Sequence, residues 1–102
     1  MLHMAAILSA NGEKNPNLCY QVNCVGFKTV LDLATKYKIR LFCPSTIAAF
    51  GPTTPENEDG KAENTTIMKP TTMYGATKVF NELLGNYYKI KFGLDYRSIR
   101  YP

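Results

Sequence analysis

A tyrosine and a lysine stand four residues apart in the stretch TTMYGATKVFNEL, residues 71–83. On a helix, residues at this spacing share one face. A neighbouring ammonium favours the phenolate form of a tyrosine, so Tyr74 and Lys78 together have the types needed to move a proton. A half-buried tyrosine beside a solvated lysine has the same spacing. The spacing alone leaves both interpretations open, and the rest of the chain has to decide between them.

The cysteines and the histidine do not predict disulfide or metal chemistry. The three cysteines are an odd number, and none forms a C-x-x-C pair. Cys19 and Cys24 are five apart on a predicted helix, which points them to different sides, and Cys43 lies in an apolar strand. We interpret all three as reduced, packing thiols of an intracellular protein. The single histidine, His3, has no ligand partner at metal spacing, so no metal site is predicted.

Composition sets the class of protein. A chain of 102 residues with 45% hydrophobic and 20% charged residues makes at most one small globular domain. No apolar run approaches the roughly 20 residues that span a bilayer, and no charged leader precedes an apolar signal core. The net charge of +4 comes from basic residues scattered along the sequence. Such scatter predicts solvated faces, so neither a nucleic acid nor a membrane is expected as a partner.

The first half of the chain predicts one long helix after a short apolar run. Residues 4–10, MAAILSA, resemble the buried end of a parallel strand or the loop leaving it. The polar stretch NGEKNP, at 11–16, breaks the chain, with Asn15 as an N-cap and Pro16 at the first helical position. A helix is predicted from about 16 to 37. Its expected sheet-facing stripe is Leu18, Val22, Val25, Thr29 and Leu33, widened by Ala34 and Tyr37.

The second half predicts strand, helix and strand. IRLFCPS reads as a buried strand ending at Pro44, and residues 51–72 form an irregular connection of the length that is usually functional or disordered. The next helix ends near Phe92, with Gly93 as its C-cap. A short strand, LDYRSIRYP, follows. The apolar side expected for this helix is Phe80, Leu83, Leu84, Tyr87 and Tyr88.

Strand, helix, strand, helix and strand with these crossovers predict a right-handed parallel α/β sheet. Ligands bind such sheets beyond the carboxyl ends of the strands. Three stretches would meet there: AAILS after the first strand, PSTIAAFG after the second, and the start of the helix that carries Tyr74. This convergence favours a functional Tyr74–Lys78 pair over a surface pair.

Four motifs in this order carry a family resemblance: HMAAILSA, QVNCVGFKTVLDLA, FCPSTIAAFG and MYGATK. The chain resembles the extended short-chain dehydrogenase/reductases, the Rossmann-type NAD-dependent group that contains sugar-nucleotide epimerases and dehydratases. Where many epimerases have a serine-rich turn ending in V-Y-G, this chain has Ala49, Phe50 and Gly51. The resemblance implies part of a doubly wound parallel sheet, NAD as cofactor and oxidation of a small secondary alcohol, with L-threonine expected as the substrate.

The resemblance also implies roles for the polar residues. Tyr74 matches the family's catalytic acid/base, and Lys78 matches the partner that holds the nicotinamide ribose hydroxyls and keeps the phenol acidic. Thr46 matches the hydroxyl that hydrogen-bonds the reacting oxygen. Ser45 is a neighbouring candidate for substrate binding, although capping the turn at the strand end is an alternative role for it.

Further residues match the cofactor side of the family site. The turn that passes the cofactor corresponds to Met4, Ala5, Ala6, Ile7 and Leu8. Asn23 matches an asparagine that reaches the cofactor site from the helix, and an asparagine in mid-helix is otherwise unfavourable. Ser9 is a candidate for substrate contact, with a small residue that merely fits the turn as the alternative.

One departure limits these expectations. The family begins with a glycine-rich G-x-x-G-x-x-G turn that receives the pyrophosphate, and these 102 residues contain no such turn. The sequence corresponds to about the fourth to sixth strands of the family, a partial NAD-binding Rossmann domain over 1–102. An excerpt, a truncated gene product and a decayed enzyme are all consistent with this.

Three functions remain in competition. The leading one is an NAD-dependent dehydrogenase, expected as a homodimer in its full-length form, in the cytoplasm or the mitochondrial matrix, with the fragment alone inactive. A sugar-nucleotide epimerase or dehydratase is the alternative on the same fold. A non-catalytic remnant is the alternative from a different class.

Overall fold

The computed structural model describes residues 1–51 and 68–102. The predicted irregular connection over 51–72 therefore lies largely outside the described residues.

The predicted first helix is present but is built from three pieces. They are α2 (Pro16–Tyr20), a π-helical turn η1 (Gln21–Val25) and α3 (Gly26–Lys36). Asn15 caps the run as predicted, because its side-chain oxygen accepts a hydrogen bond from the Leu18 amide at 3.1 Å. The stretch before it was wrongly predicted as a break. Residues Ser9–Lys14 form the short helix α1, and only Asn15 leaves helical geometry before the chain turns at Pro16.

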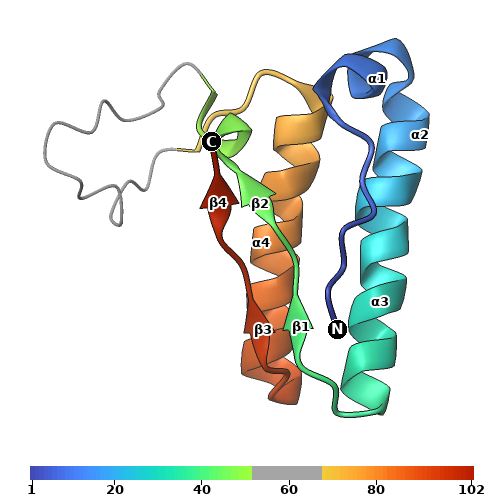
Figure 1. Ribbon diagram of the computed structural model, residues 1–102, viewed down its shortest axis with the longest axis vertical. Helices are drawn as coiled ribbons and strands as arrows, with labels where there is room; N and C mark the ends of the chain where they lie inside the picture. Colours follow the sequence, from blue (N-terminus) through green and yellow to red (C-terminus); the bar gives the residue numbers. More distant parts are fainter. Residues whose placement is uncertain (52–67) are drawn as a thin grey trace, which may run out of the picture.

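The strands are short and parallel. β1 (Leu41–Phe42) pairs with β3 (Tyr96–Arg97), and β2 (Ser45–Thr46) pairs with β4 (Arg100–Tyr101). Backbone bonds from Cys43 to Arg97 and from Ser45 to Ile99 continue the pairing between the two pieces. The first predicted strand is reduced to one bridge between Leu2 and Phe42, and the residues after it form the loop that was predicted as the alternative. The N-terminal segment, β1–β2 and β3–β4 therefore lie side by side in that order, as Figure 1 shows.

The second long helix, α4 (Met73–Phe92), runs beside this strand layer (Figure 1). It ends where predicted, with Gly93 in the left-handed conformation at φ 70° as its cap. The molecule measures only 19 Å along its shortest axis, so it consists of one layer of helices and one of strands. Between the layers lies a core of Phe27, Leu31, Ala34, Leu41, Cys43, Tyr88, Leu94 and Tyr96.

The face of the first helical run that packs inward was predicted wrongly. Leu18, Val25 and Leu33 are 44–46% exposed. Ala34 is buried as predicted, but the other buried residues are Cys19, Asn23, Cys24, Phe27 and Leu31. The helix carries two apolar stripes. The prediction took the wrong one, because hydropathy ranks leucine and valine above cysteine and asparagine. The π turn adds a further shift, because its wider ring turns the two neighbours Asn23 and Cys24 inward together.

The inner face of α4 was also predicted wrongly in part. Tyr88 is buried and Leu84 packs on the core as expected, but Phe80, Leu83 and Tyr87 are 42–60% exposed. The residues that face the strands are mostly small or polar: Gly75, Thr77, Lys78, Asn81 and Gly85. A Cβ at Gly85 would lie 2.2 Å from the Tyr96 ring, so the glycine lets that aromatic ring lie against the helix.

All three cysteines are free and buried, which confirms their prediction as packing thiols. Cys19 and Cys24 do not point to opposite sides, because both face the interior across the π turn. Burial, followed by the neighbouring Cys19, raises the pKa of the Cys24 thiol to about 11. A thiol held in its neutral form is a packing group and not a nucleophile.

Candidate functional site

The three stretches predicted to converge do so at the carboxyl ends of the strands. In Figure 1 the end of β2, the end of β4, the start of α4 and helix α1 all lie at the same end of the molecule. Glu13 of α1 accepts a hydrogen bond from the Met73 amide of α4 at 2.7 Å. The stretch after the first segment is therefore tied directly to the helix that carries Tyr74.

The first turn of α4 is fixed from several sides. Thr72 is its N-cap, and the Thr72 hydroxyl accepts a hydrogen bond from the Gly75 amide at 3.0 Å. A Cβ at Gly75 would lie 2.6 Å from the Ala48 carbonyl oxygen, so only glycine allows the helix to approach the turn after β2 this closely. The glycine between Tyr74 and Lys78 thus brings the Tyr74 turn against the 3₁₀ turn η2 (Ile47–Ala49) that follows Thr46.

Lys78 is the most unusual charge in the described residues. It is only 5% exposed, and its ammonium donates to the Pro44 carbonyl at 2.9 Å while lying 5.8 Å from the centre of the Tyr74 ring. Within residues 1–51 and 68–102 no carboxylate forms an ion pair with it. Burying an unpaired ammonium is costly, and proteins retain such groups mainly at functional sites. An ammonium has three donors, and Pro44 uses one of them.

His3 lies within the electrostatic reach of Lys78. Burial, and after it the charge of Lys78, lowers the pKa of the His3 imidazole. The ring packs against Phe27 with 5.8 Å between the two centres. His3 is therefore a partly buried packing residue, and within the described residues no cluster of three or more potential metal ligands includes it.

The hydroxyls of Thr46 and Ser45 have different hydrogen-bond partners. The Thr46 hydroxyl accepts a hydrogen bond from the Ala48 amide at 3.2 Å and so caps η2, which leaves its proton free to be donated. Ser45 is buried, and its hydroxyl donates to Glu82 at 2.6 Å. This bond uses the proton of Ser45 within the protein, which fits the structural alternative for that residue better than substrate contact.

The Met4–Leu8 turn is held by Asn23. Met4 and Leu8 are 69% and 60% exposed, whereas Ile7 is half-buried. The Asn23 amide oxygen accepts from the Ile7 amide at 2.7 Å, and its nitrogen donates to the Ile7 carbonyl at 2.9 Å and to Thr77 at 3.0 Å. Asn23 is only 1% exposed, so its side chain holds the turn and does not itself reach the surface. Ser9, the first residue of α1, stays a prediction.

Three further residues complete this network and were missed from the sequence. Thr77 joins Asn23 to the Tyr74 carbonyl, to which its hydroxyl donates at 2.8 Å. Glu82 and Arg100 join α4 to the ends of β2 and β4. Glu82 stands four residues after Lys78, a spacing that ordinarily indicates a surface ion pair. The spacing gives no sign of its actual partners, Ser45 and Arg100.

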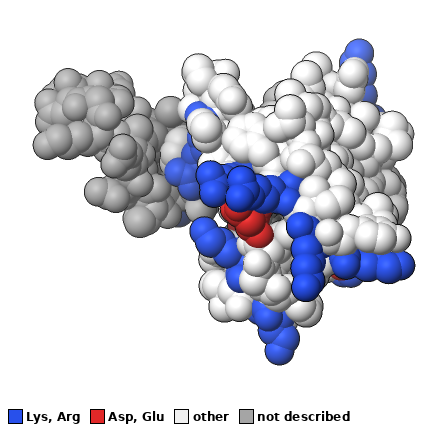
Figure 2. All heavy atoms as spheres, turned by 60° about the horizontal axis from the view of Figure 1, so that its bottom comes forward, with Lys and Arg blue, Asp and Glu red and all other residues white. Residues whose placement is uncertain are grey.

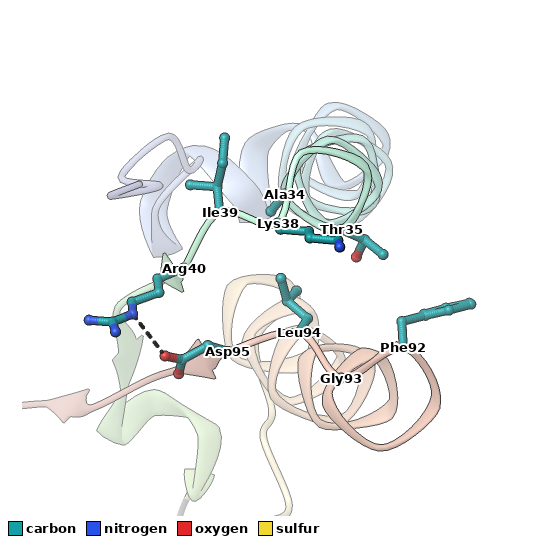
Figure 3. Close-up of a pocket in the computed structure, with 9 residues that line it drawn as sticks. All are labelled: Ala34, Thr35, Lys38, Ile39, Arg40, Phe92, Gly93, Leu94 and Asp95. Carbon is teal, nitrogen blue, oxygen red and sulfur yellow. Dashed lines mark ion pairs between the residues drawn. The ribbon is translucent and has the colours of Figure 1, made fainter.

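A cavity of about 350 Å³ lies elsewhere, at the opposite end of the molecule. It is lined by the turns after α3 and α4, including Lys38, Arg40 and Asp95 (Figure 3). Lysines and arginines gather around this end (Figure 2). Arg40 pairs with Asp95 at 3.3 Å, and none of the predicted site residues lines the cavity. Because parallel sheets bind ligands at the carboxyl ends of their strands, the residues around Tyr74 are the stronger candidate.

The residues present fit the nicotinamide half of a dinucleotide. The Lys78 ammonium keeps donors that the bond to Pro44 does not use, and the Met4–Leu8 turn presents the exposed apolar side chains of Met4 and Leu8. The described residues contain no helix long and apolar enough to cross a membrane.

Comparison with known proteins agrees with the parallel α/β fold. The chain belongs to the NAD dependent epimerase/dehydratase family, because the sequence model of that family matches residues 1–102. It is 48% identical over its whole length to the mitochondrial L-threonine 3-dehydrogenase of Bos taurus. It is 49% identical to an uncharacterized epimerase/dehydratase of Staphylococcus saprophyticus. The crystal structure of L-threonine dehydrogenase from Phytophthora infestans superimposes on 99% of the chain with a TM-score of 0.86 and 56% identity.

The match covers only part of each relative. The chain spans 26% of the bovine protein, 31% of the staphylococcal protein and 32% of the Phytophthora structure. The family and its Rossmann-type fold are established for this chain by these matches. The activity of a whole protein that carries it is a separate matter.

Proposed function

We propose that this chain is the catalytic part of the NAD-binding domain of a dehydrogenase that oxidises L-threonine to 2-amino-3-oxobutanoate. The observation that carries the proposal is the buried Lys78 ammonium, which has no carboxylate partner in the described residues and lies 5.8 Å from the Tyr74 ring. A surface tyrosine–lysine pair would leave the lysine in water. Its burial here favours the interpretation in which Lys78 holds Tyr74 ready for proton transfer.

Each residue has one task in the proposed reaction. When bound, NAD supplies the hydride acceptor. Tyr74, as phenolate, takes the proton from the 3-hydroxyl of threonine, while the Thr46 hydroxyl donates to the same oxygen and fixes its position. Lys78 stabilises the phenolate and binds the ribose hydroxyls with its free donors. Asn23 holds the Met4–Leu8 turn in place for the nicotinamide.

The choice of L-threonine rests on the two named relatives that are threonine dehydrogenases, at 48% and 56% identity. The alternative is a sugar-nucleotide epimerase or dehydratase, which the description of the staphylococcal relative favours. The two differ in product. Incubation with L-threonine and NAD gives NADH and a β-keto acid in the first case. Incubation with a nucleotide sugar gives an isomer, or a keto sugar with loss of water, in the second.

The test uses a complete enzyme that carries these 102 residues. This is either a longer protein that contains the chain or the Phytophthora enzyme in which these 102 residues replace the matching segment. We expect Tyr74→Phe to lower kcat by about 10²–10⁴-fold, the usual contribution of a general acid–base, with little change in NAD affinity. Tyr37→Phe, on an exposed tyrosine just after α3, is the matched control. Normal turnover in Tyr74→Phe contradicts the proposal, as does a nucleotide sugar being the only substrate converted.

The complete enzyme is further proposed to be an intracellular homodimer. The outer surfaces of α2–α3 and α4 expose Leu18, Val25, Leu33, Phe80, Leu83 and Tyr87. These two helical runs contact each other, and their exposed apolar side chains are the surface proposed to meet a second copy. Light scattering of the complete enzyme should give twice the protomer mass, and Leu83→Glu should halve it. A monomer before the substitution refutes this part.

A further inference from the structure

Glu82 connects three elements at the candidate site. It lies on α4 one helical turn after Lys78, and its side chain is 15% exposed. One carboxylate oxygen accepts from the Ser45 hydroxyl at 2.6 Å and from Arg100 Nε at 2.9 Å. The other oxygen accepts from Arg100 Nη2 at 2.9 Å. The carboxylate therefore joins α4 to the ends of β2 and β4.

The bond to Ser45 makes a second tie between α4 and the segment that carries Thr46. The first tie runs from Lys78 to the carbonyl of Pro44, the residue before Ser45. Two adjacent residues of the strand end are thus fixed by two helix residues that lie about 6 Å apart along the helix axis. Two ties fix an orientation as well as a distance. They set where the next residue, Thr46, lies relative to Tyr74 on the same helix.

Arg100 gives the carboxylate its orientation. The guanidinium binds both oxygens, lies 4.9 Å from the centre of the Phe50 ring and contacts the Met68 sulfur at 3.4 Å. Burial acts to raise the pKa of Glu82, but the hydrogen bonds from Arg100 and Ser45 outweigh it and lower the pKa. Because an ionised carboxylate only accepts, the Ser45 hydroxyl has to donate to it. The strand end is left with one preferred orientation.

We propose that Glu82 is a positioning residue for the reaction: through Ser45 it places Thr46, and through Arg100 it is itself held in place. This inference rests on the proposed function, since it concerns the oxygen that Thr46 binds. Misplacement of a catalytic group by about 1 Å can cost on the order of 10²-fold in rate. Loss of the Ser45–Glu82 bond should therefore lower kcat while leaving NAD binding intact.

Three substitutions in the complete enzyme separate positioning from stability. Ser45→Ala removes only the tie, whereas Glu82→Ala removes the tie and the ion pair. Glu82→Gln keeps an acceptor for Ser45 but leaves Arg100 without its counter-charge. Each protein is assayed as kcat per NADH-binding site, counted by the fluorescence of bound NADH, so that unfolded molecules do not lower the measured value. Lys28→Ala, which removes an exposed ion pair with Asp32 on α3, is the matched control.

We expect kcat per NADH-binding site to fall about tenfold or more in Ser45→Ala and Glu82→Ala, with the KM for NAD within twofold. The double variant should be no worse than the poorer single one, because both remove the same tie. Glu82→Gln should melt at a lower temperature yet retain kcat within about threefold. Full kcat per NADH-binding site in Ser45→Ala overturns the proposal, even where Glu82→Ala fails to fold. Failure of the unsubstituted enzyme to oxidise threonine refutes the proposed function instead, and the comparison is then made with whichever substrate it converts.

Discussion

Replacing Asn23 with alanine should weaken NAD binding although the side chain is buried. The substitution removes three hydrogen bonds to oxygen or nitrogen partners, two with Ile7 and one with Thr77, and a weaker one to the Cys19 sulfur. The amide and carbonyl of Ile7 then lose the partners that fix this part of the Met4–Leu8 turn. The turn is free to move in the unliganded enzyme and has to be ordered when the dinucleotide binds.

The size of the effect follows from the number of residues released. Fixing the backbone of one residue costs about 1–2 kcal/mol, and Ile7 is the one residue of the turn held by this side chain. Because 1.4 kcal/mol corresponds to a factor of ten, the NAD dissociation constant should rise about 5–30-fold. Stability should also fall by about 3 kcal/mol, since three hydrogen bonds of about 1 kcal/mol each are lost.

The assay is calorimetric titration of the complete enzyme with NAD, together with its thermal melt. Thr77→Val is the discriminating control, because it removes the bond of Asn23 to α4, along with the Thr77 bond to the Tyr74 carbonyl, and leaves both bonds to Ile7 intact. Its dissociation constant for NAD should stay within about threefold of the unsubstituted value. Unchanged NAD affinity in Asn23→Ala refutes the reasoning. Equal losses in the two variants indicate that the contact between Asn23 and α4, and not the turn, governs binding.

Lys78→Met should weaken NAD binding and lower kcat, because the buried ammonium that donates to Pro44 and lies beside the Tyr74 ring is lost; unchanged NAD affinity and kcat show that Lys78 takes no part in the site. Because the pKa of Glu82 is lowered on folding, its contribution to stability is present above the ordinary value of 4.5 and is lost as the pH falls through the folded-state pKa. Thermal melts over this range should show the loss, and Glu82→Gln should flatten it. Gly85→Ala should cost about 1–3 kcal/mol, because the new Cβ meets the Tyr96 ring, whereas Asn86→Ala next to it should be neutral. Expressed alone, the 102 residues should self-associate and give no measurable heat with NAD; a monodisperse monomer with micromolar affinity contradicts this.

The helices were predictable where their signals are local. Asn15 and Pro16 start the first run, and Gly93 ends α4, because caps depend on side chains within a few residues of the helix end. The parallel strands followed from the order of elements. The π turn at Gln21–Val25 has no such signal, since it arises where Asn23 turns inward to bind Ile7, sixteen residues away.

The candidate site was predictable only where a motif carries it. Tyr74, Lys78 and Thr46 were identified by family resemblance, and the structure shows how glycine and capping residues hold them. Glu82 and Arg100 were missed because their partners are distant in sequence: Ser45 lies 37 residues from Glu82, and Arg100 lies 18 residues beyond it. A hydrogen bond across such a separation depends on the fold and leaves no trace in local spacing.

The wrongly predicted face of α4 has a physical cause in the site itself. Hydropathy places the most apolar side of this helix against the sheet, but that position is taken by Thr77, Lys78 and Asn81. Thr77 is held inward by Asn23 and Lys78 by the Pro44 carbonyl, so the apolar side chains Phe80, Leu83 and Tyr87 face outward. A helix whose apolar side chains face outward loses the free energy of burying them, unless another surface covers them. The same displacement therefore accounts for two features at once: a polar inner face and an apolar outer face of α4.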